Sequence, residues 1–330
     1  MGEPLRLVFM GSDPVALPLL DWLAGEGRAA ANLAGIFTGP DRPSGRGQAL
    51  RPNAVKAWSA GKPVEVFQPE KLGPAELEAL KALKADAVLV VAYGHILRDE
   101  FISVPRLGTL NVHASLLPRL RGASPIQTAV ASGEKETGVS LMRIVRELDA
   151  GPVAAVERVP IGPLDTAGDI ERRIAAAAVP LVSGALGKLA SGALSFREQD
   201  ASQATFCRRL SKADGTLDFS APAAPLAARV NGLFPWPSVT VPLNGESIRV
   251  GQADCAYSPG AGVPGTVVGA DAHGLLIATG SGTLRLRRLQ RPGGRMLEAR
   301  EFLLGKSVGA GTLVASSPMA SLVSPRPFPR

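Results

Sequence analysis

Apolar runs alternate with helical patterns along the first half of the chain. Short runs rich in aliphatic residues predict strands at residues 5–10, 33–38, 64–67, 87–92, 109–113, 138–144 and 152–159. Apolar residues recur at helical spacing in residues 75–83 and 165–189. A continuous run such as 87–92 is typical of a strand buried on both faces. Strands that alternate with helices predict an α/β fold with a doubly wound, mostly parallel, Rossmann-like sheet.

The pattern changes after residue 190, where short strands replace this alternation. A helix is predicted over residues 223–233, followed by short strands at 238–241, 248–254, 265–269, 275–278 and 283–289. Glycine-rich turns separate these strands, which is typical of a small OB-like β-barrel. Residues 316–330 contain Ser-Pro, Arg-Pro and Phe-Pro pairs without periodicity, so we predict a disordered tail. The predicted parts are an α/β domain (1–189), a linker (190–209), an OB-like C-terminal domain (210–315) and the tail (316–330).

Composition changes this picture little. The chain is 45% hydrophobic and 20% charged, an ordinary globular mixture. Its two cysteines do not suggest a disulfide framework, which favours a reducing compartment. The N-terminus has no signal pattern, and the longest apolar segment, 174–190, is broken by Pro180 and two glycines. We therefore expect a soluble, cytoplasmic monomer without a membrane span.

The net charge of +7 is unevenly distributed. Residues 1–205 hold 22 basic and 22 acidic residues, whereas residues 206–330 hold 14 basic and 7 acidic residues. The second part carries the whole excess, which is a hint of a polyanionic partner. A basic surface that only contacts solvent explains the same numbers, so charge alone leaves both interpretations open.

Candidate catalytic side chains follow two of the predicted strands. Asn111 and His113 are two residues apart on one strand, so their side chains point to the same side. That strand runs into a break at Pro118, and ligands of doubly wound sheets bind beyond the carboxyl ends of strands. Asp149 follows the strand at 138–144 and should lie at a strand end too. The alternative is that Asn111 and His113 are satisfied polar groups that hold a loop together.

These residue types suit one class of reaction. An asparagine amide and an imidazolium both donate hydrogen bonds to an oxyanion, and a nearby carboxylate orients the imidazole and favours its charged form. The chain has no G-x-S-x-G element, which favours attack of an external nucleophile on a carbonyl over covalent catalysis. The absence of a G-x-G-x-x-G fingerprint and of a Walker loop argues against a nicotinamide dehydrogenase or a nucleotide kinase. The three histidines are not spaced as zinc ligands, so no metal is expected.

Residues 39–52 form a long loop that carries Arg42, Arg46 and Arg51 among glycines and prolines. A mobile basic loop near a crevice can grip phosphate or nucleic acid. A merely solvated loop fits the same residues, so this alternative also stays open.

Several sequence motifs are distributed over both predicted domains. Residues 111–126 read NVHASLLPRLRGASPI, which resembles the signature N-V-H-x-S-L-L-P-R-x-R-G-A-x-P-I of the 10-formyltetrahydrofolate-dependent formyltransferases. The family's D-R-P-x-G-R-G matches residues 41–47, and its A-Y-G-x-I-L matches residues 92–97. Its L-S-K-x-D-G matches residues 210–215, and an element like N-P-W-P matches residues 234–237. The resemblance runs in order over about residues 5–312 and so includes both domains.

The resemblance implies an activity and a set of site residues. Asn111, His113 and Asp149 match the family's catalytic asparagine, histidine and aspartate. The formyl donor would be 10-formyltetrahydrofolate, a co-substrate, and no metal is implied. Folate contacts are implied for Ser115, Leu116, Leu117 and Pro118, with the pterin near Ile96 and Leu97.

The acceptor implied by the resemblance is the α-amine of methionine on initiator tRNA. The family holds the acceptor end with its arginine loop, so Arg42 and Arg46 are the candidates here. The basic second domain would lie along the tRNA backbone and contact phosphates. Its arginine cluster comprises Arg285, Arg287, Arg288, Arg291 and Arg295, of which Arg287 and Arg288 are the first candidates.

Some residues depart from the family pattern. Gln48 and Ala49 stand where members often have two lysines, and residues 11–16 read GSDPVA where G-T-P-x-F-A is usual. Residues 147–152 partly resemble glycinamide ribonucleotide formyltransferases, which lack the C-terminal β domain. Three alternatives stay open: a formyltransferase for another amine such as an amino sugar nucleotide, a formyl-folate hydrolase, and a non-catalytic RNA-binding protein. A basic OB-like domain favours tRNA over the first, and the intact trio argues against the last.

Overall fold

The structure, a computed structural model, describes residues 3–44, 48–256, 262–305 and 307–329. Its contacts divide the chain into two compact units. The first unit holds Met1–Arg121, Gly138–Val159 and Glu171–Ala204, and the second holds Gly122–Thr137, Pro160–Ile170 and Thr205–Arg330. Residues 122–137 and 160–170 are thus grouped with the C-terminal part.

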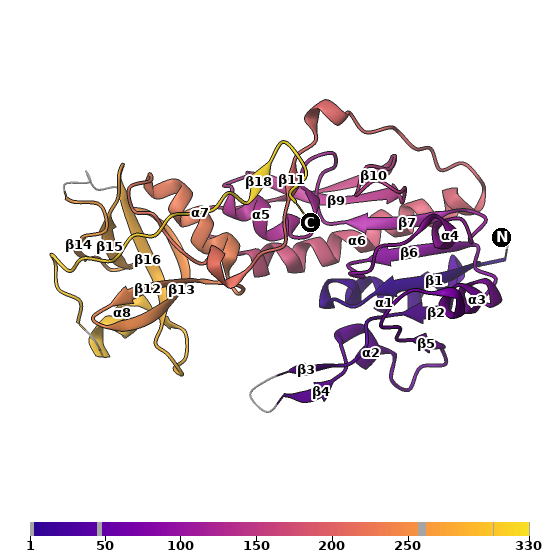
Figure 1. The fold of residues 1–330 in the computed structure, drawn as a ribbon, viewed down its shortest axis with the longest axis horizontal. Helices are drawn as coiled ribbons and strands as arrows, with labels where there is room; N and C mark the ends of the chain where they lie inside the picture. The colour runs from indigo at the N-terminus through magenta and orange to yellow at the C-terminus, as the bar shows by residue number, and fades with distance from the viewer. Residues whose placement is uncertain (1–2, 45–47, 257–261, 306, 330) are drawn as a thin grey trace. The chain divides into compact units, whose positions relative to one another are not determined.

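A seven-stranded sheet forms the centre of the first unit (Figure 1). Its strand order is β10-β9-β7-β6-β1-β2-β5, and the neighbours from β7 to β5 are parallel. Strand β9 runs antiparallel to β7. The mostly parallel α/β sheet predicted from the sequence is confirmed. The strands are β1 (Leu5–Gly11), β2 (Ala31–Phe37), β5 (Val66–Phe67), β6 (Ala87–Val91), β7 (Thr109–His113), β9 (Glu136–Arg143) and β10 (Val153–Pro160).

Helices connect these strands, and the first begins where the sequence indicates. The Asp13 side chain accepts a hydrogen bond from Val15 N at 3.0 Å, and Pro14 occupies the first turn. All residues of β6 are buried, which explains its continuous apolar run. The helices of this part are η1 (Pro14–Ala16), α1 (Leu17–Ala24), η2 (Glu26–Ala29), α2 (Ala54–Ser59), α3 (Pro74–Ala82), α4 (Asp99–Ile102), α6 (Ala167–Ala190) and η3 (Ala201–Gln203).

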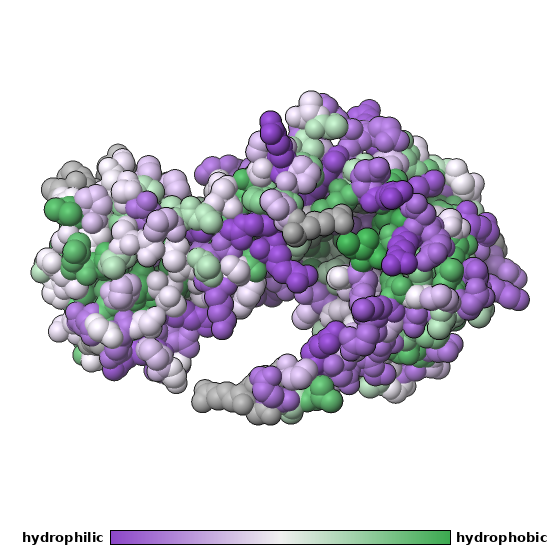
Figure 2. Space-filling model, viewed as in Figure 1, coloured by the Kyte–Doolittle hydropathy of each residue, from purple (hydrophilic) through white to green (hydrophobic). Residues whose placement is uncertain are grey.

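Among the described residues, α6 is the one helix long and apolar enough to cross a membrane by length and composition. Its buried side chains include Ile174, Ala178, Leu181 and Ala185, which recur every three or four residues along one face. This is the pattern of a core helix in a soluble protein, and hydrophilic residues cover much of the visible surface of each unit (Figure 2). Helix α6 continues through Pro180.

An antiparallel half-barrel forms the core of the second unit. Its strand order is β12-β13-β16-β15-β14, and β17 pairs with β16. Helix α7 packs against β13, and a Cβ on its Gly232 would meet Ala131 N of α5 at 2.2 Å. The predicted β-rich domain is therefore confirmed. The elements are β8 (Arg121–Gly122), α5 (Pro125–Ala131), β11 (Phe206–Cys207), η4 (Lys212–Asp214), α7 (Ala223–Leu233), β12 (Val239–Leu243), β13 (Glu246–Ala256), β14 (Val267–Ala270), β15 (Leu275–Ala278), β16 (Thr283–Gln290), β17 (Leu297–Glu298), α8 (Ala299–Gly305) and β18 (Val323–Ser324).

The C-terminal segment differs from the predicted disordered tail. Strand β18 pairs with β11 in antiparallel fashion, and Leu322 beside it is buried. Arg229 Nη1 also donates a hydrogen bond to Ala320 O at 3.1 Å. The prolines of this segment remove backbone donors but leave every carbonyl free to accept, so the segment can still pack against the second unit.

Leu322→Ala is expected to lower the free energy of unfolding by about 2 kcal/mol, because it removes a buried side chain. Leu322 is 5% exposed and Leu313 is 67% exposed. Leu313→Ala is the matched control and is expected to change that free energy by less than about 0.5 kcal/mol. Denaturant unfolding of both variants measures the difference. Equal effects would mean that the tail contributes nothing to the folded state.

Candidate active site

Strand β7 carries two of the candidate catalytic residues. Asn111 pairs in register with Val90 of β6 on one side and Met142 of β9 on the other. His113 ends the strand and is 6% exposed. Because side chains alternate along a strand, Asn111 and His113 present their polar groups on the same face. Both residues lie on the regular strand that the prediction of a shared face requires.

The imidazole of His113 lies between a carbonyl and a carboxylate. Its Nε2 lies 3.1 Å from Leu120 O, and its Nδ1 lies 3.7 Å from Asp149 Oδ2. A carbonyl oxygen only accepts hydrogen bonds, so Nε2 carries a hydrogen in this arrangement. Nδ1 then faces the carboxylate of Asp149.

Asp149 reaches His113 by a different route from the one expected. The sequence argument placed it at a strand end without fixing the direction of that strand, and β9 is antiparallel to β7, with Arg143 opposite Leu110. Ile144 N donates to Thr109 O at 2.8 Å, so the loop after β9 begins near the start of β7. The loop must run back along β7 to bring Asp149 to His113. Asp149 does follow a strand, and the return of the loop brings its carboxylate to within 3.7 Å of the imidazole.

Arg121 lies close to this site. It belongs to the motif at residues 111–126, but the sequence predicted no role for it. It is buried, and the loss of solvent lowers the pKa of its guanidinium, while the negative charge of Asp149 acts in the opposite direction. A buried cation beside the carboxylate adds to the charge balance of the site. The spacing of the motif does not predict that Arg121 lies near Asp149. Their proximity depends on how the loop that carries Asp149 folds back.

The loop after β7 is shaped by its own polar groups. Ser115 Oγ donates to Arg119 O at 2.6 Å, and Ser140 Oγ donates to Ser115 O at 2.7 Å. Leu117 N donates to Ser140 Oγ at 3.1 Å. The buried Ser115 hydroxyl is thus engaged within the loop, whereas Leu116, Leu117 and Pro118 remain partly exposed. Sequence reasoning did not identify Ser140, which holds the loop from the neighbouring strand.

The two candidates near the pterin lie differently in the loop after β6. Ile96 is 73% exposed, whereas Leu97 is buried in an apolar cluster with Tyr93 and Phe101. The carboxyl ends of the parallel strands β6 and β7 lie at one edge of the sheet, so this loop and the loop after β7 border the same edge. Ile96 can contact a ligand through its side chain, and Leu97 supports the loop from below.

The basic loop contains a hairpin that the sequence did not predict. Its strands are β3 (Arg42–Ser44) and β4 (Ala49–Arg51), which pair in antiparallel fashion. Arg42 Nη2 lies 2.8 Å from Glu70 Oε2, and both side chains are about two-thirds exposed, at 65% and 66%. Arg46 lies outside the described residues. An exposed ion pair of this kind is weak, so a phosphate can replace Glu70 as the partner of Arg42.

Neutral side chains anchor the base of this hairpin at Gly39. Ser12 Oγ accepts from Gly39 N at 2.9 Å. Asn53 Nδ2 and Gln68 Nε2 donate to Gly39 O at 2.7 and 3.0 Å. Thr38 Oγ1 donates to Asn53 Oδ1 at 2.9 Å and completes the network. The hairpin therefore starts from a fixed point at the carboxyl ends of β1 and β2.

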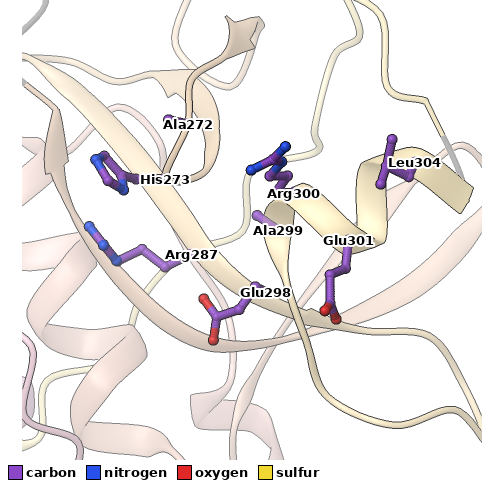
Figure 3. A pocket seen from close by; sticks show the side chains of 8 residues that line it. All are labelled: Ala272, His273, Arg287, Glu298, Ala299, Arg300, Glu301 and Leu304. Atoms are coloured by element: carbon purple, nitrogen blue, oxygen red, sulfur yellow. The ribbon is translucent and has the colours of Figure 1, made fainter.

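The candidate arginines of the second unit are paired with acids. Arg287 Nη1 lies 2.9 Å from Asp254 Oδ2, and Arg288 Nε lies 3.4 Å from Glu298 Oε1. Arg287 also lines a pocket of this unit (Figure 3). The pocket is lined by Ala272, His273, Arg287, Glu298, Ala299, Arg300, Glu301 and Leu304. The positive charge on this surface is thus partly balanced by acidic neighbours.

Metal ligands are not gathered anywhere in the part of the chain that the structure describes. No group of three or more His, Cys, Asp or Glu side chains there could hold a metal ion. The groups that contact the His113 ring are the carbonyl of Leu120 and the carboxylate of Asp149.

An imidazole beside a carboxylate and an amide, on a mostly parallel sheet joined to a β-rich half-barrel, defines an enzyme of carbonyl transfer. The chain belongs to the formyl transferase family. The model of that family, described as formyl transferase, matches residues 5–186, and the model of its C-terminal domain matches residues 209–307. The predicted family membership is thereby confirmed.

Named relatives share most of the chain. A methionyl-tRNA formyltransferase of Pseudomonas fluorescens (strain SBW25) is 44% identical over 318 residues, which is 94% of this chain and 99% of the relative. A methionyl-tRNA formyltransferase of Pseudomonas putida (strain GB-1) is 41% identical over 92% of this chain and 100% of the relative. Both relatives therefore align over the two units together.

Solved structures show the same fold at low sequence identity. An N-formyltransferase from Helicobacter canadensis, in complex with folinic acid and dTDP-3-aminofucose, has a TM-score of 0.63 at 14% identity and covers 87% of this chain and 100% of its own. HypX from Aquifex aeolicus, in complex with tetrahydrofolic acid, has a TM-score of 0.61 at 17% identity over 92% of this chain and 48% of its own. These likenesses support the fold and carry no assignment of acceptor.

Proposed function

We propose that the chain transfers the formyl group of 10-formyltetrahydrofolate to the α-amine of methionine on initiator tRNA. The observation that carries this proposal is the His113 ring, which is held between the Leu120 carbonyl and Asp149 beside Asn111. The 44% identity to a methionyl-tRNA formyltransferase over 94% of the chain supports methionyl-tRNA as the acceptor. The product is N-formylmethionyl-tRNA, which serves translation initiation.

The chemistry follows from the three side chains. The methionine amine attacks the formyl carbon, and the carbonyl oxygen becomes an oxyanion that accepts hydrogen bonds from the Asn111 amide and the His113 imidazolium. The attacking nitrogen then loses a proton, and the bond between the formyl carbon and N10 of the folate breaks. N10 takes up a proton, so that tetrahydrofolate leaves as a neutral amine. Asp149 keeps the His113 ring oriented and can relay the proton through water.

The folate is proposed to lie along the two loops at the carboxyl ends of β6 and β7. Leu116, Leu117 and Pro118 are partly exposed and offer an apolar wall, and Ile96 offers a second one for the pterin. Ser115 and Leu97 are buried, so we assign them the role of shaping these loops. This arrangement has the mixture of apolar lining and few polar groups that is usual in ligand sites.

The acceptor is tested by a comparison of substrates. Purified protein is incubated with 10-formyltetrahydrofolate and with methionyl-tRNA, other aminoacyl-tRNAs or a dTDP-amino sugar, and formylated product is quantified. We expect product from initiator methionyl-tRNA at a rate far above all others. Preferred formylation of the amino sugar would instead establish the alternative acceptor. Release of free formate without any formylated amine would indicate a hydrolase.

The tRNA is proposed to contact the hairpin β3–β4 and the arginines of the second unit. Arg42 and Arg46 would hold the acceptor end, while Arg287 and Arg288 would contact phosphates after exchange of their acidic partners. Arg42, Arg287 and Arg288 each lie beside an acidic side chain, so contact with tRNA would replace these ion pairs.

Arg42→Ala is expected to raise the Kd for tRNA about tenfold, the effect of one lost charged contact, and to leave folate binding unchanged. Filter binding of tRNA and fluorescence titration with a folate analogue measure the two effects. Arg28→Ala, an exposed arginine on η2 of the same unit, is the matched control and should bind tRNA like the parent. An unaltered tRNA affinity in Arg42→Ala would refute the assignment.

We also propose that the enzyme acts as a monomer in the cytoplasm, where aminoacylated tRNA and reduced folates are present. We assign catalysis to residues 1–189 and tRNA binding to the C-terminal domain, residues 210–315, with residues 190–209 as the linker between them.

A further inference from the structure

The amide of Gln199 is fully used in hydrogen bonds around the loop that carries Asp149. Its Nε2 donates to Asp149 O at 2.8 Å and to Gly151 O at 2.7 Å. Its Oε1 accepts from Arg121 Nε at 3.1 Å and from Arg121 Nη2 at 2.7 Å. A primary amide has two donors and two acceptor sites, so Gln199 has no hydrogen-bonding capacity left over. Such complete use indicates a fixed position for the loop.

The loop needs this support because its backbone conformation is unfavourable. Asp149 has a φ of 49°, in the left-handed region that non-glycine residues rarely adopt. Gly151 lies so close to β9 that a Cβ there would meet Arg143 O at 1.9 Å. The two carbonyls that Gln199 binds are those of these two residues. The Gln199 side chain therefore stabilises the backbone of Asp149 and Gly151 in a conformation that these residues would not favour by themselves.

Gln199 also fixes the buried cation beside Asp149. Arg121 comes from the end of the loop after β7, and its fork of Nε and Nη2 is directed to one oxygen of the amide. The amide is neutral, so it satisfies two donors of the guanidinium without neutralising its charge. Arg121 therefore keeps its positive charge, which attracts the carboxylate of Asp149. The negative charge of Asp149 in turn acts to raise the pKa of the Arg121 guanidinium.

We propose that Gln199 is a positioning residue that holds Asp149 against His113 by joining the Asp149–Gly151 loop to Arg121. It touches none of the reacting groups and acts through Asp149, so its role rests on the proposed formyl transfer. Gln199 lies in the segment between α6 and η3, which the sequence suggested was only a connector. That segment is therefore a working part of the catalytic centre.

A double-mutant cycle tests this role. Gln199→Met removes every hydrogen bond of the amide at similar volume, and is expected to lower kcat about tenfold or more with the KM for tRNA unchanged within about twofold. In an Asp149→Ala background the same substitution should lower kcat no further, because the group that it positions is gone. Gln203→Met is the matched control, since the Gln203 amide donates to Asp200 on the same segment, and it should keep parental kcat.

Further measurements separate positioning from folding. Gln199→Glu keeps an acceptor for Arg121 but removes the donors to the two carbonyls, and is expected to lose kcat as Gln199→Met does while unfolding at the parental temperature. Hydrogen exchange of residues 145–151 should be faster in both variants than in the parent. A kcat of Gln199→Met within twofold of the parent, or equal losses in both backgrounds, would overturn the proposal. If the parent protein forms no formylmethionyl-tRNA, the proposed function is overturned instead. Hydrogen exchange of residues 145–151 would still show whether Gln199 holds the loop in place.

Discussion

His113→Ala is expected to lower kcat for formylation of methionyl-tRNA by at least ~10². The substitution removes the donor to the oxyanion and the group that exchanges a proton beside Asp149. It also leaves the Leu120 carbonyl without its partner on the ring, which lies 3.1 Å away in the parent. Single-turnover experiments with saturating tRNA and 10-formyltetrahydrofolate measure the chemical step directly.

Two readouts show whether a loss of activity comes from the chemistry. His113 is almost completely buried, so the variant must be compared with the parent by thermal unfolding before its rate is interpreted. The affinities for tRNA and for a folate analogue should change by less than about threefold, since the proposed role of His113 lies in the transition state. Activity near that of the parent would sink the catalytic assignment.

The second large effect is expected from Gly151→Ala. A Cβ at this position would lie 1.9 Å from Arg143 O, which is backbone and cannot move away easily, and 3.3 Å from Val145 Cγ1. The loop must shift to make room, and a shift carries Asp149 away from His113. Because a displacement of about 1 Å can lower a rate by as much as ~10², we expect kcat to fall at least about tenfold.

A glycine elsewhere in the same unit provides the matched control. Gly184 lies in α6, and a Cβ there would meet nothing within 4 Å. Gly184→Ala should keep the parental kcat and raise the free energy of unfolding by about 0.5–1 kcal/mol, because alanine has the better helix propensity. The rates of both variants are compared under the same conditions. If Gly151→Ala turns over like the parent, close packing against β9 does not position Asp149.

Much of the fold follows from local pattern. Strand β7 and helix α7 have the bounds that alternation and helical spacing predict, because each is bordered by residues that end it. The hairpin β3–β4 was missed, since a loop rich in glycine, proline and arginine has no apolar alternation. The C-terminal segment was also missed, because its order depends on Arg229 and on β11, which lie far away in the sequence.

In the site, too, some features follow from neighbouring residues in the sequence, and others depend on residues far away in the sequence. The side-by-side position of Asn111 and His113 depends only on the period of a strand, so it could be predicted. The approach of Asp149 depends on the direction of β9, which residues 138–144 do not reveal. Gln199 could not be identified at all, because it is separated from Arg121 by 78 positions and has an ordinary polar neighbourhood in the sequence.

The way in which the hairpin is anchored has a consequence for ionic strength. Its base at Gly39 is held by hydroxyl and amide groups of Ser12, Asn53 and Gln68, none of which is charged. Salt screens the attraction between arginines and phosphates over about 10 Å at 0.1 M, but it has little effect on neutral hydrogen bonds. Added salt should therefore release tRNA while the hydrogen bonds that anchor the hairpin at Gly39 remain intact. Inhibition by salt should then be overcome by more tRNA and reversed at once on dilution.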